Sequence, residues 1–288
     1  MTASPSSKLN ANPFGRPRDF LQNRFVYLRV SARGGGLTIG VNLNPDRKCN
    51  FECVYCEIDR LAPPKAPRLD VELMAAELSQ TLALVRGGNL RSLRAYRSLP
   101  DELLQLRHVA LSGDGEPTLC PEFPEAIQAV MHVRALAGFA FFKVVLLTNG
   151  AGLGLPHVQQ TIAHFTRADQ IWIKLDGGTQ AYLNRINGTR VPLERILSNI
   201  LSLGRQRPVV IQSLFPSHLG EPPPAEEIER YAHRLLELKQ AGAEISLVRI
   251  YSALHPTRLP EYGHLPLKEL SRIAQAVRQI ADLNAEVS

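Results

Sequence analysis

Three of the four cysteines of this chain fall within eight residues. Cys49, Cys53 and Cys56 have the spacing C-x3-C-x2-C, and they follow an apolar segment that reads as a strand. A loop of this kind can place three thiolates around one face of an iron–sulfur cube, with backbone amides left to donate hydrogen bonds to the sulfides. The types and spacing of these residues therefore indicate a metal centre.

Zinc is the alternative metal for these thiols. A structural zinc site needs four tetrahedral protein ligands, and the sequence has no second C-x2-C pair and no H-x3–5-H pair to complete one. Cys120 is then the one thiol left to act as the fourth ligand. Buried thiols without a metal are the remaining alternative, which the close spacing of the three cysteines disfavours.

The redox state expected of the cysteines depends on the compartment. Residues 1–12 are rich in Ser and Asn and lack an apolar core, so we expect no signal peptide. No apolar run approaches the ~20 residues of a membrane helix, and the longest, Phe139–Leu147, contains Lys143. We therefore expect a soluble, cytoplasmic protein without a membrane partner, whose cysteines are reduced thiols or metal ligands.

The elements that must position these cysteines are short apolar segments that alternate with helical patterns. The apolar segments show little alternation, which is typical of strands buried on both faces of a parallel sheet. The six predicted strands are residues 37–43, 108–111, 144–148, 171–175, 209–214 and 245–251. The six predicted helices are residues 71–86, 121–137, 156–166, 193–205, 225–241 and 267–281, and residues 88–100 read as a surface insertion.

This alternation predicts an α/β fold with right-handed crossovers, built as an open sheet or as a barrel. The chain has 288 residues, of which 44% are apolar and 21% charged, so a sizeable core is available and a disordered or disulfide-scaffold protein is excluded. No G-x-G-x-x-G follows the first strand, so a dinucleotide-binding fold lacks its best marker. In either architecture, function lies at the carboxyl ends of the strands.

Two predicted strands end in segments that suit ligand binding. The second leads into Gly113-Asp114-Gly115-Glu116, where the glycines permit close backbone approach and the last carboxylate can accept a hydrogen bond from an ammonium group. The third leads into Thr148 and Asn149, and Asn149 starts an Asn-Gly pair that by itself marks a turn.

The fourth predicted strand carries charge. Alternation places Trp172, Lys174 and Asp176 on one face of it. A lysine in a buried strand is costly unless it is paired, so Lys174 requires an ionic partner. That partner is Asp176, Glu116 or a ligand carboxylate, and structural pairing and cofactor binding are both open.

The cysteine spacing, with Tyr55 as the aromatic residue of C-x3-C-x-aromatic-C, resembles the signature of the radical S-adenosylmethionine (SAM) superfamily. The resemblance implies a 4Fe-4S cluster on Cys49, Cys53 and Cys56, with SAM chelating the remaining iron. It further implies that the reduced cluster cleaves SAM to a 5′-deoxyadenosyl radical that abstracts hydrogen from a substrate. A reductant such as flavodoxin or ferredoxin is the implied electron donor.

The same resemblance assigns roles to the other motifs. Gly113, Asp114, Gly115 and Glu116 resemble the segment that holds the methionyl amino group of SAM, although Asp114 departs from the usual double glycine. Thr148, Asn149, Lys174 and Asp176 become candidate SAM contacts. The implied fold is a partial (β/α)6 TIM-like barrel over residues 18–255, with a flexible leader (1–17) and a C-terminal helical extension packed on the barrel (256–288).

A narrower resemblance concerns the bacterial and archaeal iron–sulfur oxidoreductase group related to wyosine-base tRNA enzymes. It is carried by Arg18-Asp19-Phe20, Asn23–Tyr27, Gly40–Pro45 and the run S-G-x-G-E-P-T-L. The wyosine enzymes carry extra cysteines for a second cluster, whereas this chain has Cys120 alone to spare. We therefore expect neither a second cluster nor a two-cysteine methyl-transfer mechanism, and we interpret Cys120 as a small buried thiol.

Polar residues on and after the last two predicted strands are substrate-side candidates: Gln212, Ser213, Arg249, Tyr251 and His255. The 33 basic and 27 acidic residues give a net charge of +6, a mild excess that favours tRNA or another RNA weakly. Small-molecule chemistry, formation of a glycyl radical on a partner enzyme, and a non-catalytic metal or iron–sulfur module are the alternatives.

Overall fold

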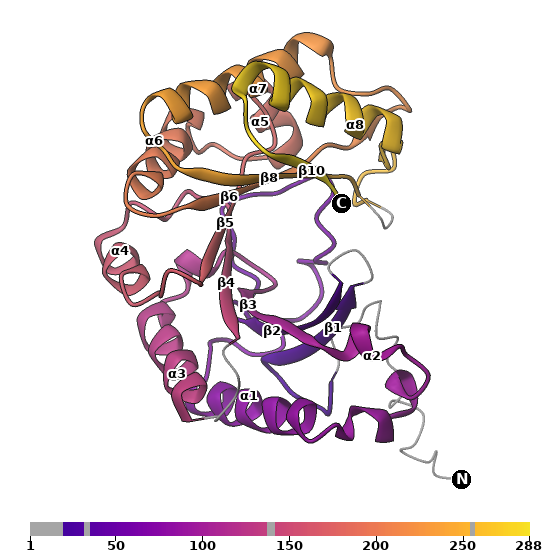
Figure 1. The fold of residues 1–288 in the computed structure, drawn as a ribbon, viewed down its shortest axis with the longest axis vertical. Helices are drawn as coiled ribbons and strands as arrows, with labels where there is room; N and C mark the ends of the chain where they lie inside the picture. The colour runs from indigo at the N-terminus through magenta and orange to yellow at the C-terminus, as the bar shows by residue number, and fades with distance from the viewer. Residues whose placement is uncertain (1–19, 32–34, 137–141, 254–256) are drawn as a thin grey trace. The chain divides into compact units, whose positions relative to one another are not determined.

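The computed structural model describes residues 20–31, 35–136, 142–253 and 257–288. The predicted leader, residues 1–17, and His255 lie outside these described ranges. The chain forms two compact units, and each is described by itself (Figure 1). The first unit contains the residues up to Lys48 and Pro63–Leu146, and the second contains Cys49–Ala62 and Leu147–Ser288.

A mixed sheet in the order β1-β2-β3-β4 forms the centre of the first unit. The first two strands pair antiparallel and the others are parallel. Ile39, Val109 and Val144 are register partners across three neighbouring strands, and all three are fully buried. The strands are β1 (Val26–Ser31), β2 (Gly36–Asn42), β3 (Leu106–Ser112) and β4 (Lys143–Thr148).

Helices α1 and α3 of the first unit pack against each other beside this sheet (Figure 1). The carboxylate of Asp70 accepts a hydrogen bond from the Leu73 amide at 3.0 Å and begins α1 where the sequence predicts it. The predicted insertion forms short helical turns. The elements are α1 (Val71–Arg86), η2 (Asn89–Ser92), η3 (Arg94–Tyr96), α2 (Asp101–Leu104), η4 (Pro117–Leu119) and α3 (Phe123–Leu136).

A buried carboxylate on α1 holds the start of β1. Glu77 is 6% exposed and accepts hydrogen bonds from the backbone amides of Arg24, Phe25 and Val26 at 2.8, 2.9 and 3.1 Å. A carboxylate with this many charge-assisted hydrogen bonds replaces the water that these amides would otherwise need. Glu77 therefore fixes β1 against α1.

The main sheet of the second unit is entirely parallel, in the order β5-β6-β8-β10. The short strands β7 and β9 form a separate antiparallel pair. The bounds are β5 (Gln170–Lys174), β6 (Val209–Leu214), β7 (Ser217–His218), β8 (Ile245–Tyr251), β9 (Tyr262–Gly263) and β10 (Ala285–Val287).

One face of this sheet packs on helices. Figure 1 shows α6, α7 and α8 along the same side of β6, β8 and β10. On β6, Ser213 is fully buried and its hydroxyl is 2.6 Å from the hydroxyl of Tyr231 on α7. The helices are α4 (Pro156–Ile162), α5 (Gln180–Asn187), α6 (Leu193–Gly204), α7 (Ala225–Gln240) and α8 (Leu267–Ala276), followed by a π-helical turn, η5 (Val277–Ala281).

All six predicted strands and all six predicted helices are present; the predicted ends are correct for β6, β8 and α1 and differ at one or both ends for the others. The elements that were not predicted are β1, β10 and α5, the short strands β7 and β9, and short helical segments such as α2 and η4. Only Tyr182, Leu183 and Ile186 are buried apolar residues in α5, which is too few for a clear helical period. The predicted C-terminal helical extension contains α8 and η5, and its end adds β10 in parallel to β8.

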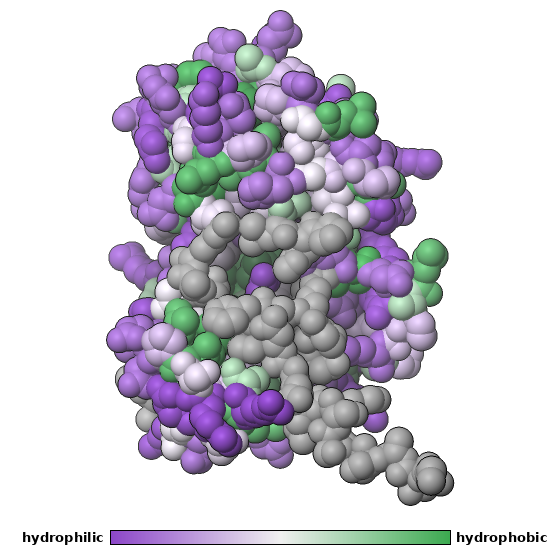
Figure 2. Space-filling view, turned by 90° about the vertical axis from the view of Figure 1, so that its right-hand side faces the viewer, coloured by the Kyte–Doolittle hydropathy of each residue, from purple (hydrophilic) through white to green (hydrophobic). Residues whose placement is uncertain are grey.

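The face of the molecule drawn in Figure 2 is mainly hydrophilic among the described residues. In the view of Figure 2, hydrophilic side chains cover most of the described surface, and apolar side chains form separate groups between them. Within the ranges that the structure describes, none of the helices has the length and apolar character needed to cross a membrane.

We predict that Glu77→Ala lowers the free energy of unfolding by about 3 kcal/mol, because three backbone amides lose their acceptor. Urea titration followed by circular dichroism measures this change. Glu72→Ala, at an exposed position of the same helix, is the control and should change it by less than about 0.5 kcal/mol. Equal effects of the two changes would contradict the role given to Glu77.

Candidate functional site

The cysteine loop of the second unit lies on the carboxyl end of α5. The backbone amides of Glu52 and Val54 donate to the carbonyls of Asn187 and Ile186 at 2.8 and 2.9 Å. The hydroxyl of Thr189 donates to the Asn50 carbonyl at 3.1 Å. The last carbonyls of a helix have no partner inside it, so the loop supplies donors that this helix end requires.

Gly188 makes this close approach possible. It ends α5 in the left-handed conformation, with φ of +53°. A Cβ atom there would lie 2.8 Å from the carbonyl oxygen of Glu52, closer than such contacts allow. Glycine is therefore required both by the backbone conformation and by the packing of the loop.

The sulfurs of the loop receive N–H donors. The Phe51 amide donates to Cys49 Sγ at 3.4 Å, and Asn187 Nδ2 donates to Cys53 Sγ at 3.2 Å. Asn149 Nδ2 is 4.0 Å from Cys49 Sγ. All three cysteines of the loop are free thiols; Cys53 is buried, whereas Cys49 and Cys56 are half-buried. Such donors favour sulfur that carries negative charge, as in an iron–sulfur cluster.

Burial keeps the Cys53 thiol protonated in the absence of a metal. Burial raises the pKa of this thiol to about 11, against the lowering effects of Lys174 and of the hydrogen bond from Asn187. Without a metal, the thiol therefore stays protonated near neutral pH. A metal that binds here displaces a proton.

A buried polar cluster made of Tyr55, Lys174, Asp176 and Asn187 lies behind Cys53. The Asp176 carboxylate is 0% exposed and accepts hydrogen bonds from Asn187 Nδ2 at 2.7 Å and from the Tyr55 hydroxyl. Its other oxygen accepts from the Leu214 amide at 2.9 Å. Both carboxylate oxygens are thus occupied within the protein.

Lys174 belongs to this cluster and confirms the expected ionic pairing. Its ammonium lies 3.5 Å from Asp176 and donates to the Tyr55 hydroxyl at 2.9 Å. Burial alone would lower the pKa of Lys174, but the Asp176 carboxylate raises it above its ordinary value. The Lys174 side chain is 23% exposed, so it is not fully enclosed by the protein.

The connection between β5 and α5 is fixed from α7. Glu227 is 7% exposed and accepts hydrogen bonds from the Gly178 amide at 2.6 Å and from the Thr179 amide and hydroxyl at 3.1 and 2.6 Å. The Thr179 hydroxyl also caps α5 by accepting from the Tyr182 amide. These bonds hold Asp176, two residues before Gly178, relative to the start of α5.

Thr148 and Asn149 form the turn after β4. The Thr148 hydroxyl accepts from the Gly150 amide at 3.1 Å, and Asn149 Oδ1 accepts from the Ala151 amide at 3.0 Å. Asn149 Nδ2 donates to Asn50 Oδ1 at 2.7 Å. The structure therefore brings Asn149 to the cysteine loop, and its role as a SAM contact stays a prediction.

The segment Gly113-Asp114-Gly115-Glu116 belongs to the first unit and is held by β2. The Asp114 amide donates to Asn42 Oδ1 at 3.0 Å, and Asn42 Nδ2 donates back to the Asp114 carboxylate at 2.9 Å. A Cβ atom on Gly113 would lie 2.2 Å from Asn42 Oδ1. Asp114, which departs from the usual double glycine, thus has a structural partner in this chain.

Glu116 is also engaged locally. Its carboxylate accepts from the amide and hydroxyl of Thr118 at 3.1 and 2.7 Å, and it is 3% exposed. Its backbone amide donates to the carbonyl of Lys48, the residue before Cys49, at 2.9 Å. A Cβ atom on Gly115 would lie 2.0 Å from that carbonyl oxygen, so this glycine permits the contact.

Cys120 is a buried thiol, as expected from the sequence. Its Sγ lies 3.5 Å from a carboxylate oxygen of Glu122, and burial raises the pKa of its thiol to about 12. Among the described residues, no three His, Cys, Asp or Glu side chains surround one metal position. Thiolates of a four-iron cluster bind different irons, so they are not required to converge on one point.

The residues of these arrangements whose contacts were not predicted from the sequence include Asn42, Asn187 and Glu227. The pair Asn187-Gly188 carries a helix-end signal that could have located α5. No sequence signal joins Asn187 to Cys53, which lies 134 residues earlier in the chain, because that contact arises from the fold.

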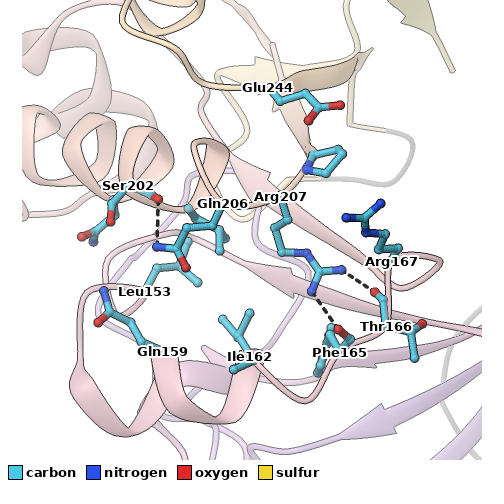
Figure 3. A pocket seen from close by; sticks show the side chains of 14 residues that line it. Leu153, Gln159, Ile162, Phe165, Thr166, Arg167, Ser202, Gln206, Arg207 and Glu244 are labelled. Carbon is cyan, nitrogen blue, oxygen red and sulfur yellow. Dashed lines mark hydrogen bonds between the residues drawn. The ribbon is translucent and has the colours of Figure 1, made fainter.

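A pocket of about 500 Å³ lies elsewhere in the second unit (Figure 3). Residues of α4 and α6 and of the segments that lead into β5, β6 and β8 line it, and none of them is a predicted site residue. Because catalytic residues of such folds lie at the opposite, carboxyl ends of the strands, we assign no chemistry to this pocket.

Comparisons with known proteins agree with the motifs. The pattern of the radical SAM superfamily matches residues 43–235. A UPF0026 protein of Helicobacter pylori strain J99 is 26% identical over 240 residues, which are 82% of this chain and 70% of that protein.

The fold is also similar to solved structures. A radical SAM methyltransferase from Sphaerobacter thermophilus has a TM-score of 0.62 at 16% identity, over 91% of this chain and 68% of that one. A structure of TYW1 with a lysine–pyruvate adduct bound has a TM-score of 0.55 at 19% identity, over 85% and 74%. These likenesses confirm the predicted α/β fold class.

The superfamily match begins before the cysteine loop and extends into α7. It therefore contains the C-x3-C-x2-C motif, the segment from Gly113 to Glu116, the turn after β4, and β5 with its Lys174. Members of this superfamily are enzymes that bind a 4Fe-4S cluster and SAM. The chain belongs to the radical SAM superfamily.

Proposed function

We propose that Cys49, Cys53 and Cys56 hold a 4Fe-4S cluster that cleaves SAM reductively, and that the reaction modifies a base in RNA. The observation that carries the cluster assignment is the set of N–H donors directed at the sulfurs of Cys49 and Cys53. When bound and reduced, the cluster supplies the electron that splits SAM into methionine and the 5′-deoxyadenosyl radical. The electron comes from a reductant such as flavodoxin or ferredoxin.

The side chains around Cys53 have different proposed roles in binding SAM. Lys174 keeps its charge because of Asp176 and is partly exposed, so it suits the carboxylate of SAM. Asp176 has no exposed surface, and it therefore acts by orienting Lys174 and Asn187 rather than by touching SAM. This refines the set of SAM contacts that the sequence suggested.

The contacts of the segment Gly113–Glu116 favour binding of SAM through the backbone groups of the segment. Gly113, Asp114, Gly115 and Glu116 are held through Asn42 and Lys48, and Glu116 and Asp114 have partners within the protein. We infer that this segment binds SAM through its backbone groups, whereas the turn of Thr148 and Asn149 lies on the side of Cys49. The rigid turns lower the entropy that binding must overcome.

An RNA substrate is supported by surface charge and by the resemblance of the sequence to the group related to wyosine-base tRNA enzymes. Residues 86–107 carry the exposed arginines Arg86, Arg91, Arg94, Arg97 and Arg107 and the acidic residues Asp101 and Glu102. Lysine and arginine side chains on one surface segment bind phosphates in a salt-dependent manner. A site of this kind would hold the RNA while a base reaches the radical.

We do not expect Lys174 to form a covalent adduct like the lysine–pyruvate adduct of the TYW1 structure. Attack on a carbonyl by an amine needs the neutral amine. The Asp176 carboxylate favours the ammonium form of Lys174 and raises its pKa. We therefore assign Lys174 to charge pairing and not to covalent chemistry.

The cluster assignment predicts the effect of single cysteine changes. Cys49→Ala, Cys53→Ala and Cys56→Ala should each lose most of the about four irons per chain that anaerobic reconstitution introduces, together with formation of 5′-deoxyadenosine after reduction. Iron and sulfide analysis and chromatography of the products measure both. Cys120→Ala is the matched control and should keep the cluster. Loss of iron in this control would refute the ligand assignment.

The hydrogen bond from Asn187 to Cys53 predicts a second effect. Asn187→Leu removes an N–H donor from a ligand sulfur, so the cluster should become harder to reduce, and SAM cleavage should slow by about 10- to 100-fold. Redox titration followed by electron paramagnetic resonance measures the potential. Asn284→Leu, at an exposed position before β10, should leave it unchanged. An unaltered potential in Asn187→Leu would contradict this role.

The RNA proposal predicts salt-dependent binding. The double variant Arg94→Ala, Arg97→Ala should bind tRNA more weakly and lower the slope of log affinity against log salt by about 2, one for each phosphate that is no longer neutralised. Arg195→Ala, Arg230→Ala, with both arginines exposed on α6 and α7, is the control. Wild-type protein without affinity for tRNA at low salt would refute the RNA branch while leaving the cluster assignment intact.

A further inference from the structure

A row of polar side chains crosses the parallel sheet of the second unit. Lys174 on β5 is the register partner of Gln212 on β6, Gln212 is the partner of Arg249 on β8, and Arg249 is the partner of Glu286 on β10. Register partners in neighbouring strands point to the same face of a sheet. Four polar side chains therefore stand side by side.

This face is the one that the helices leave open. Ser213, the neighbour of Gln212 on β6, points to α7, where it contacts Tyr231. Successive residues of a strand alternate between the faces, so Gln212 points away from α7. Gln212 and Arg249 are half-buried and Glu286 is exposed, whereas Ile211, Val248 and other residues of the helix face are fully buried.

Arg249 contacts an aromatic ring, but its guanidinium lacks hydrogen-bond acceptors among the described residues. Its guanidinium lies 4.3 Å from the centroid of the Trp172 ring on β5, two strands away. Its Nε is buried and has no hydrogen-bond partner. With the residues that the structure describes, Arg249 forms no ion pair, and the side-chain amide of Gln212 forms no hydrogen bond. Two neighbouring groups thus keep their hydrogen-bonding capacity on a partly buried surface.

Arg207 shows what a structural arginine looks like in the same unit. Its Nε is also buried without a partner, and its guanidinium lies 5.8 Å from the Phe165 ring. However, its terminal nitrogens donate to the carbonyls of Phe165, Thr166 and Asp169 at 3.4, 2.7 and 2.7 Å, two of which are drawn in Figure 3. Arg249 has the same stacking but lacks such acceptors among the described residues.

We propose that Arg249 and Gln212 bind an anionic oxygen group of the substrate, a carboxylate or a phosphate, on the face stacked by Trp172. The proposal rests on the proposed function, because it places the substrate on the sheet that carries Lys174. Arg249 is two strands from Lys174, roughly 10 Å at the usual strand spacing. The substrate anion and the carboxylate of SAM therefore have separate basic partners.

The chemistry of the row fits such a ligand. The guanidinium fork matches the two oxygens of a carboxylate or phosphate, and the amide of Gln212 adds a donor on the neighbouring strand. Stacking on Trp172 fixes the plane of the fork before binding, which lowers the entropic cost. Burial lowers the pKa of Arg249, and Glu286 partly offsets this. An incoming anion replaces the hydration that burial removes from the guanidinium.

Glu286 limits the affinity. It is the acidic neighbour of Arg249 in the row, and it lies on the side away from Lys174. A second negative group near the guanidinium repels an incoming anion. Glu286→Gln should therefore bind anions more tightly than the wild type, whereas Gln212→Leu and Arg249→Lys should bind them more weakly.

The test follows the arginine Nε–H signals of the full chain, labelled with ¹⁵N-arginine and reconstituted with its cluster. Arg249→Lys and Arg207→Lys identify the two signals. Inorganic phosphate and acetate are titrated separately at constant ionic strength. We expect the Arg249 signal to shift saturably with one of the two anions, which identifies the class, while the Arg207 signal stays fixed. Gln212→Leu should weaken binding about tenfold, and Glu286→Gln should strengthen it a few-fold.

The outcomes separate this proposal from the proposed function. An unshifted Arg249 signal, or equal shifts of the Arg249 and Arg207 signals, in protein that cleaves SAM would overturn the anion site alone. Protein that shows the selective shift but neither holds a cluster nor cleaves SAM would overturn the proposed function and keep the anion site. Glu286→Gln is expected to bind the anion more tightly, and misfolding of the variant would not produce that result.

Discussion

The hydrogen bonds between the cysteine loop and the end of α5 are the constraint on which the proposed metal centre depends. The loop around Cys49, Cys53 and Cys56 has no regular secondary structure of its own, so its own backbone does not fix the sulfurs. Two backbone hydrogen bonds, one threonine hydroxyl and a glycine in the left-handed conformation hold it against the helix. The helix in return gains donors for carbonyls that would otherwise lack them.

The same helix end joins the loop to a buried charge pair. Asn187 donates both to Cys53 and to Asp176, so the position of a ligand sulfur is coupled to the position of Lys174. Burying Lys174 and Asp176 costs solvation that their attraction repays only when further hydrogen bonds satisfy them. Tyr55 and the Leu214 amide provide those bonds. Removal of Lys174 would leave the Asp176 carboxylate, which has no exposed surface, without its cation.

Much of the fold was predictable because the parallel strands are short apolar runs with mostly buried residues. Runs such as Val209–Leu214 and Ile245–Tyr251 stand out against the polar helices and begin and end where the structure places them. α5 was not predictable, because its stability comes from Thr179, Glu227 and the cysteine loop rather than from an apolar stripe. β10 has three residues, and it is a strand because β8 offers an edge.

The candidate site also has parts that were predictable from the sequence and parts that were not. The cysteine motif, the glycine-rich segment and the charge on β5 were visible, because each is a local pattern. The partner of Lys174 was among the predicted alternatives, since Asp176 is two residues away. By contrast, Asn42 meets Asp114 across 72 residues, and Asn187 meets Cys53 across 134. Contacts of that separation follow from the order of strands, which the sequence leaves open.

The alternation of residues along β6 and β8 links the core to the proposed binding face. Ser213 and Ile250 pack toward the helices, so their neighbours Gln212 and Arg249 must point to the other side. A register shift by one residue would bury Arg249 against the helices, where a guanidinium without a carboxylate is costly. The apolar packing therefore fixes the position of the polar row, and Arg249 stays available for a ligand because the helix face excludes it.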